Sequence, residues 1–174
     1  KAVHEVALTE IAFVVLDNVS LEIVDKKSWL IKPYHSDLIY DPKAAEASNI
    51  TKEMCEEYGE DIKLVFKEIL AMIKKNKRGS KKPILAGQNI IKFDLEFIEN
   101  LFEYCGQDIY KHFDSEVFDT MIWSRYRWPE EGKHNLAVIA ERSGLEHTQA
   151  HRALPDTIIT ANIVSQMISN FRGN

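Results

Sequence analysis

The chain has 174 residues, of which 45% are hydrophobic and 28% charged, which is ordinary for one globular domain. Its net charge of −5 argues against a broadly basic nucleic-acid-binding surface, although an acidic enzyme can still grip a few nucleotides in a cleft. No apolar run approaches the ~20 residues of a membrane span, and no signal-peptide pattern opens the chain. The two cysteines, Cys55 and Cys105, stand far apart without a CxxC partner. We therefore expect one domain over residues 1–174, no membrane partner and a cytoplasmic setting with reduced thiols.

The first third of the chain reads as β-structure. Residues 6–16 are almost continuously apolar, which is typical of a strand covered on both faces. Residues 17–18 supply turn chemistry, and the apolar runs 21–24 and 29–31 predict that the chain continues as a meander of three antiparallel strands. Glu10 is the one charged residue well inside the first run. It is either a metal ligand or, more commonly at such a position, a charged strand end or a partner for a lysine.

Helices follow an irregular stretch over residues 34–49. Thr51 is a suitable N-cap for a short helix over 52–58 that ends at Gly59. Asp61 caps a longer helix with apolar residues at three- and four-residue spacing. The lysines and arginine of residues 74–82 are either a solvated helix end that complements the helix dipole or a phosphate-binding patch.

The second half alternates short apolar runs with helical patterns. Residues 83–86 predict a buried strand, and Asp94 follows at the junction with a helix whose face carries Phe93 and Phe97. Residues 117–118 predict a second short strand. Residues 123–128 interleave aromatics with arginines, a pattern that fits either core packing or base stacking. Residues 134–144 predict a further helix, with His134 near its start.

The last long helix has Pro155 and Asp156 in its first turn, and His151 lies just upstream. A histidine and an aspartate at this offset can face one cleft, the first as a base and the second as a metal ligand. The alternative is that Asp156 only improves the helix start and that His151 is a surface residue.

Two of these stretches resemble motifs of the DEDDh, or DnaQ-like, 3′–5′ exonucleases. Asn89, Phe93 and Asp94 resemble the second motif, with Asn89 one residue further from the aspartate than in the commonest form. Residues 151–156 (His-Arg-Ala-Leu-Pro-Asp) closely resemble the third. The resemblance covers residues 4–168 and implies an α/β fold of the ribonuclease H-like type, a mixed sheet with helices on both faces.

The resemblance also implies a site. Asp94 and Asp156 would bind two Mg²⁺ or Mn²⁺ ions from side chains ~4–8 Å apart, and His151 would take a proton from the attacking water. Asn89, Phe93 and Arg152 would contact the substrate, whereas an Asp-Thr pair like Asp119-Thr120 is structural in this family. The substrate would be a single-stranded 3′ end of DNA or RNA, the product a nucleoside 5′-monophosphate, and a DNA polymerase is a candidate partner. The alternative function is a non-catalytic nucleic-acid-binding or scaffold domain.

One departure concerns the family's first motif, an Asp-x-Glu that supplies two more carboxylates. Asp17 is the only other candidate for it and fails, because Val19 stands where the glutamate should be. The missing strand would lie between the strands at 6–16 and 84–86, and unpaired buried backbone groups cost ~1–3 kcal/mol each. We therefore expect about twenty further residues ahead of Lys1 and a gap of ~9–10 Å between these two strands.

Overall fold

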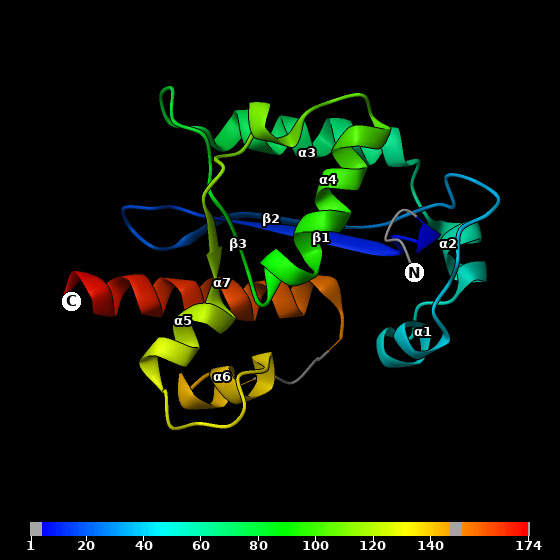
Figure 1. Cartoon of the computed structure of the whole chain (residues 1–174). Coiled ribbons are helices and arrows are strands. Elements are labelled where there is room, and N and C mark those ends of the chain that lie inside the picture. Colours follow the sequence, from blue (N-terminus) through cyan, green and yellow to red (C-terminus); the bar gives the residue numbers. More distant parts are fainter. Residues whose placement is uncertain (1–4, 147–150, 174) are drawn as a thin grey trace.

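The computed structural model describes residues 5–146 and 151–173 as a mixed α/β arrangement. Its strands are β1 (Glu10–Leu16), β2 (Ile23–Leu30), β3 (Leu85–Gly87) and β4 (Val117–Asp119). Its helices are α1 (Pro42–Ser48), α2 (Lys52–Tyr58), α3 (Ile62–Asn76), α4 (Asp94–Tyr104), α5 (Thr120–Arg127), α6 (Leu136–Arg142) and α7 (Ala153–Arg172), with short 3₁₀ turns η2 (Ile90–Lys92) and η3 (Ile109–Lys111). Figure 1 shows α3 on one side of the β1–β2 pair and α7 on the other.

The strands form two separate pairs. β1 and β2 are antiparallel, with Glu10 opposite Leu30, and β3 and β4 are parallel, with Gly87 opposite Asp119. The parallel pairing is as predicted. The expected three-stranded meander is wrong, because β2 is one continuous strand. Its polar middle pairs with β1, with Asp25 opposite Val15 and Lys27 opposite Phe13. Asp25 and Lys27 also form ion pairs with side chains of α3.

β1 and β3 were predicted not to pair directly with each other, and they do not. In the part of the chain that the structure describes, each belongs to a separate two-stranded sheet. Both pack against α7. This helix runs along β1 and the turn beyond it: Ala153 at its start binds Glu10, and near its end Arg172 Nη2 donates to the Asn18 carbonyl at 2.6 Å. β1 begins at Glu10 rather than at Val6, and Ile11 is its one buried residue. The expectation of a strand covered on both faces is therefore wrong for β1 as the structure shows it.

The main hydrophobic core lies between the β1–β2 pair and helices α3 and α4. Trp29 and Ile31 from the strand side meet Phe66 of α3 and Phe102 of α4, and the two phenylalanine rings pack edge to face at 4.9 Å. The buried face of α3 is the predicted one. A smaller cluster around Ile139 and Ile163 joins α6 to α7.

Two local results refine the sequence reading. The stretch expected to be irregular contains α1, with Asp41 as its N-cap and Pro42 in the first turn, a start signal that the sequence does carry. Gly59 ends α2 as predicted, but its φ of −68° is not the left-handed value common for a glycine at a helix end. Glycine is required there because a Cβ would come within 3.0 Å of backbone atoms of Ile31, Lys32 and Cys55.

Candidate functional site

The start of α7 holds His151 and Asp156 in one hydrogen-bonded turn. The backbone N–H of His151 donates to Asp156 Oδ2 at 3.1 Å, and the Asp156 N–H donates to the Arg152 carbonyl at 3.1 Å. His151 has φ +69°, a left-handed conformation that costs a non-glycine residue about 1–3 kcal/mol. Such a conformation persists only where its surroundings impose it. The structure therefore brings together two of the predicted site residues in a constrained turn.

Asp94 is the first residue of α4, directly after the turn η2. The residue as a whole is exposed, yet the protein packed around its carboxyl group displaces water, and this desolvation together with the nearby charge of Asp119 raises the pKa of Asp94. Phe93 beside it is 60% exposed and its ring lies 5.5 Å from that of Phe97. An exposed aromatic next to an acid suits a site that stacks a base.

Asp119 anchors the segment that leads to Asp94. Its carboxylate accepts backbone N–H groups from Asn89 at 3.0 Å, Ile91 at 3.3 Å and Met121 at 2.9 Å, and the residue is only 4% exposed. These bonds hold Asn89 in a left-handed conformation (φ +56°) and cap α5. Asp119 thus has the structural place expected for it, since its oxygens bind protein amides. The substrate role of Asn89 stays a prediction.

A partly buried polar network beside this anchor was not foreseen from the sequence. The Thr120 hydroxyl binds the Gly87 carbonyl and the side chain of Gln88, whose Nε2 donates to the His134 carbonyl at 2.7 Å. The His134 ring binds Ser124 Oγ through Nδ1 and the Glu131 carbonyl through Nε2, both at 2.9 Å. Both ring nitrogens are therefore used within the fold. The N-cap of α6 is Asn135, so His134 lies one residue before the cap.

Glu10 and Arg152 form an ion pair that joins β1 to α7. Arg152 Nη2 donates to Glu10 Oε1 at 2.9 Å, and Arg152 Nε donates to Oε2 at 3.3 Å. Of the readings open for Glu10, the structure therefore supports a basic partner, but this partner is an arginine rather than a lysine. Arg152 remains half exposed, and its predicted contact with substrate stays a prediction.

The described residues alone do not make a two-metal site. Over residues 5–146 and 151–173, no three side chains of histidine, cysteine, aspartate or glutamate lie close enough together to hold a metal ion. Mg²⁺ and Mn²⁺ bind through several oxygen ligands, so Asp94 and Asp156 by themselves do not fit the pair of metals. That these two carboxylates converge on one cleft stays a prediction.

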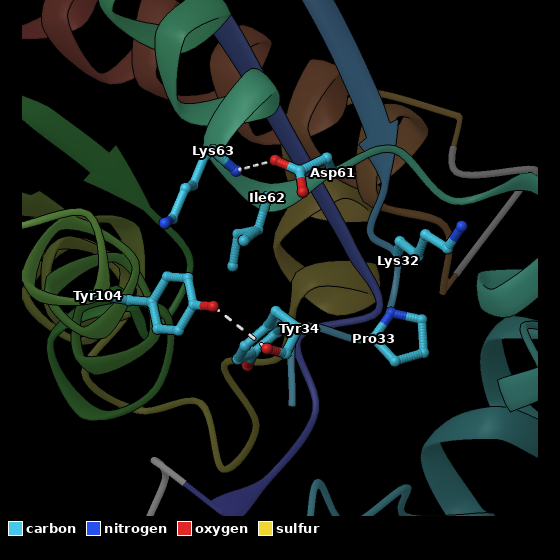
Figure 2. A pocket seen from close by; sticks show the side chains of 7 residues that line it. All are labelled: Lys32, Pro33, Tyr34, Asp61, Ile62, Lys63 and Tyr104. Carbon is cyan, nitrogen blue, oxygen red and sulfur yellow. Dashed lines mark hydrogen bonds between the residues drawn. The ribbon is translucent and has the colours of Figure 1, made fainter. Parts of the chain in front are cut away.

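Other candidate features lie apart from this site or are used in packing. A cavity of about 230 Å³ lies beside Tyr34, Lys63 and Tyr104, with the Tyr104 hydroxyl bound to the Tyr34 carbonyl at 3.1 Å (Figure 2). Tyr104 ends the helix that Asp94 begins, which separates the two by about 15 Å along α4.

Several side chains of the aromatic stretch 123–128 and of the basic stretch 74–82 contact other groups of the protein. Trp123 stacks on Phe118 at 5.1 Å, and Arg142 lies over the Trp128 ring at 5.6 Å. Trp123 and Trp128 thus contact other side chains, but Trp123 is 39% and Tyr126 82% exposed, so both interpretations of the stretch 123–128 stay open. In the basic stretch 74–82, Lys75 and Arg78 bind Asp25 and Asp17, which favours the reading as a helix end over a phosphate-binding patch.

Comparison with known proteins agrees with the motifs at α4 and α7. A family model described as exonuclease (RNase_T) matches residues 2–164. The chain belongs to this exonuclease family. The family resemblance drawn from residues 89–94 and 151–156 is therefore confirmed.

Relatives of this exonuclease domain include much longer proteins. The PolC-type DNA polymerase III of Staphylococcus aureus is 38% identical over 80 residues, which is 46% of this chain and 5% of the polymerase. Exonuclease I superposes over 93% of this chain and 37% of its own with a TM-score of 0.76 and 22% identity. Exonuclease X in complex with 5′ overhanging duplex DNA superposes over 98% of this chain and 87% of its own, with a TM-score of 0.65 and 22% identity. These superpositions confirm the ribonuclease H-like fold. Among the described residues, no helix is long and apolar enough to cross a membrane.

Proposed function

We propose that this exonuclease-family domain hydrolyses phosphodiester bonds at the 3′ ends of DNA or RNA and releases nucleoside 5′-monophosphates. The observation that carries the proposal is the constrained turn at the start of α7, in which the His151 N–H binds the Asp156 carboxylate. The exposed His151 ring is the general base that takes a proton from the attacking water, the commonest role of a catalytic histidine. Asp94 and Asp156 are the acids of the site.

Divalent metal, Mg²⁺ or Mn²⁺, belongs to this proposal as the group that neutralises phosphate charge. The zinc-bound form of an E. coli exonuclease I–ssDNA complex is among the similar structures, at a TM-score of 0.73 and 19% identity over 94% of this chain and 37% of its own. Asp94 and Asp156 are too few ligands for such metals, so the proposal needs further carboxylates.

We infer that an extended segment between β1 and β3 supplies them. Among the described residues, each of these strands pairs on one edge only and both pack on α7. Most of β1 is only half buried, although all its residues after Glu10 are apolar. A strand inserted there would satisfy both open edges and could bring two acidic side chains to the site.

The substrate class rests on the relatives. A PolC-type DNA polymerase III is similar over part of this chain, and E. coli exonuclease I in complex with a dT13 oligonucleotide superposes with a TM-score of 0.75 and 20% identity over 95% of this chain and 38% of its own. We therefore propose a single-stranded 3′ end as the substrate and a DNA polymerase as a candidate partner. Exposed Phe93, whose ring lies 5.5 Å from that of half-buried Phe97, gives a surface on which a terminal base can stack.

The test is degradation of a 5′-labelled single strand by the complete polypeptide with Mg²⁺ or Mn²⁺. Asp94→Ala and Asp156→Ala should each abolish product formation while the protein stays folded. His151→Ala should lower turnover by roughly 10²–10⁴-fold, the usual contribution of a general base. Full activity of the His151 variant would refute its role as the base. Unchanged activity of both aspartate variants would refute the function itself.

A second candidate function is a non-catalytic nucleic-acid-binding or scaffold domain. It is favoured by one observation, that no group of three metal-binding side chains is assembled in the described ranges. Oligonucleotide binding by the complete polypeptide that is indifferent to EDTA, without any mononucleotide product, would support this candidate over the nuclease.

A further inference from the structure

The carboxylate of Glu10 joins the first residue of β1 to the first turn of α7. Besides the two bonds from Arg152, its Oε2 accepts the backbone N–H of Ala153 at 2.9 Å. The Glu10 side chain is only 9% exposed, while that of Arg152 is 50% exposed. Both carboxylate oxygens are therefore bound by donors from the start of one helix, more than 140 residues further along the chain.

This arrangement replaces the usual cap of a helix. Arg152 is the N-cap residue of α7 and makes no side-chain capping bond. Glu10 instead accepts the N–H of Ala153, one of the first helical N–H groups, which have no partner within the helix. A carboxylate next to a helix start also interacts favourably with the helix dipole. The planar guanidinium fork of Arg152 fixes the orientation of the contact, because two parallel N–H groups must meet two oxygens.

The contact of Glu10 with Arg152 and Ala153 lies immediately beside the strained turn of the site. His151 precedes Arg152 and is left-handed, with its N–H on Asp156 Oδ2. The turn is therefore held on its C-terminal side by Glu10 and across the first helical turn by Asp156. At the far end of α7 the contact with the β1 side of the domain is made by other groups, Ser165 with the Leu21 carbonyl at 2.9 Å and Arg172 with Asn18. Loss of Glu10 would therefore free the start of α7 without freeing the helix.

We propose that Glu10 is a positioning residue for the hydrolysis: through Arg152 and the Ala153 amide it sets where His151 and Asp156 stand relative to β1. The kinetic part of this inference rests on the proposed exonuclease function. Glu10 itself touches neither substrate nor reacting atoms, and acts through the turn that it holds.

The first experiment measures the turn directly, without reference to activity. Amide hydrogen exchange of the complete polypeptide is compared for wild type, Glu10→Gln and the control Glu22→Gln, an exposed acid in the turn between β1 and β2. Glutamine keeps the shape and one acceptor but loses the charge that binds Arg152. We expect exchange in the segment 151–157 to be at least tenfold faster in Glu10→Gln, with Glu22→Gln and the rest of α7 unchanged. Equal protection of this segment in all three proteins would overturn the inference.

The second experiment separates positioning from mere stability. In steady-state degradation of a labelled single strand, Glu10→Gln should lower kcat by about 10–100-fold with KM changed less than about threefold. The reversed pair, Glu10→Arg with Arg152→Glu, should recover part of kcat relative to either single variant, because the ion pair returns while the Ala153 bond does not. An unchanged kcat, or a loss matched by a smaller folded fraction in urea titration, would overturn the inference. A wild-type protein without nuclease activity would refute the proposed function, whereas the exchange result would still decide whether Glu10 holds the turn.

Discussion

Among single residues, Asp94 has a carboxyl group whose surroundings disfavour its charged form. Its carboxyl group is desolvated and near Asp119, and both effects raise its pKa above the ordinary 3.8. A raised pKa in the folded state means that the ionised form is disfavoured by folding. Such a group is typical of functional sites, where a charge is kept in place for a ligand rather than for the fold.

This gives a prediction with a defined sign. The folded pKa of Asp94 is above its unfolded value. The contribution of Asp94 to the free energy of unfolding is therefore greatest at low pH and is lost as pH rises through the folded pKa. Asp94→Asn, which cannot ionise, should therefore unfold at higher urea concentration than wild type at neutral pH in the absence of metal. The difference should shrink as the pH falls toward 4.

The control for this measurement is Glu96→Gln, an exposed acid in the same helical turn. Glu96→Gln removes one negative charge from the same turn and should not raise the unfolding midpoint at neutral pH. An Asp94→Asn protein less stable than wild type at pH 7 would contradict the prediction and would mean that the ionised carboxylate makes a favourable contact in the fold.

Among the structural elements, the junctions between strands and helices position more of the site's residues than the middles of the helices and strands do. Asp119 ends β4, caps α5 and holds the segment between β3 and α4 by two further amides. One carboxylate thus sets the relative placement of three elements. The hydrophobic periodicity of α3, α4 and α7 could be predicted locally, but a contact between residue 119 and residues 89–91 could not, because the chain separates them by about thirty positions.

Asp119→Ala should therefore be strongly destabilising. It leaves three backbone N–H groups without their acceptor in a buried place and removes a helix cap, for a loss of roughly 2–4 kcal/mol in the free energy of unfolding. Urea denaturation measures this. The matched control is Asp108→Ala, which removes a cap of the short turn η3 at an exposed position and should cost about 1 kcal/mol or less. Equal losses in the two variants would contradict the anchoring role.

At the scale of the whole molecule, the two strand pairs share α7 but not hydrogen bonds with each other. An open edge on a strand is a place where another strand can pair. The proposed segment between β1 and β3 accounts at once for both edges and for the shortage of metal ligands. Fold completion and metal binding would then be coupled.

Residues 1–174 by themselves should accordingly bind Mn²⁺ weakly or not at all. Isothermal calorimetry on protein freed of metal with EDTA measures this, and the complete polypeptide with the proposed strand should bind two ions. Tight two-site binding by residues 1–174 alone would contradict the prediction and would show that another acid, such as Glu10, completes the site.

Features that depend on neighbouring residues along the chain could be predicted from the sequence. The caps Thr51 and Asp61, the apolar face of α3, and the two motifs with Asp94 and Asp156 at helix starts are all local patterns, and the structure has them where they were predicted. The same locality explains two errors, a meander read where β2 is continuous, and a loop read where Asp41 and Pro42 begin α1.

The remaining contacts depend on how distant parts of the chain pack together. Glu10 clasps Arg152, Asp119 anchors Asn89, and Gly59 admits the close approach of Ile31 because groups distant in sequence meet in space. Charge and residue type alone left Glu10 as a ligand, a strand end or a lysine's partner. The choice among them was made by the packing of α7 along β1, since a buried carboxylate must find donors and the nearest ones belong to the turn that carries His151.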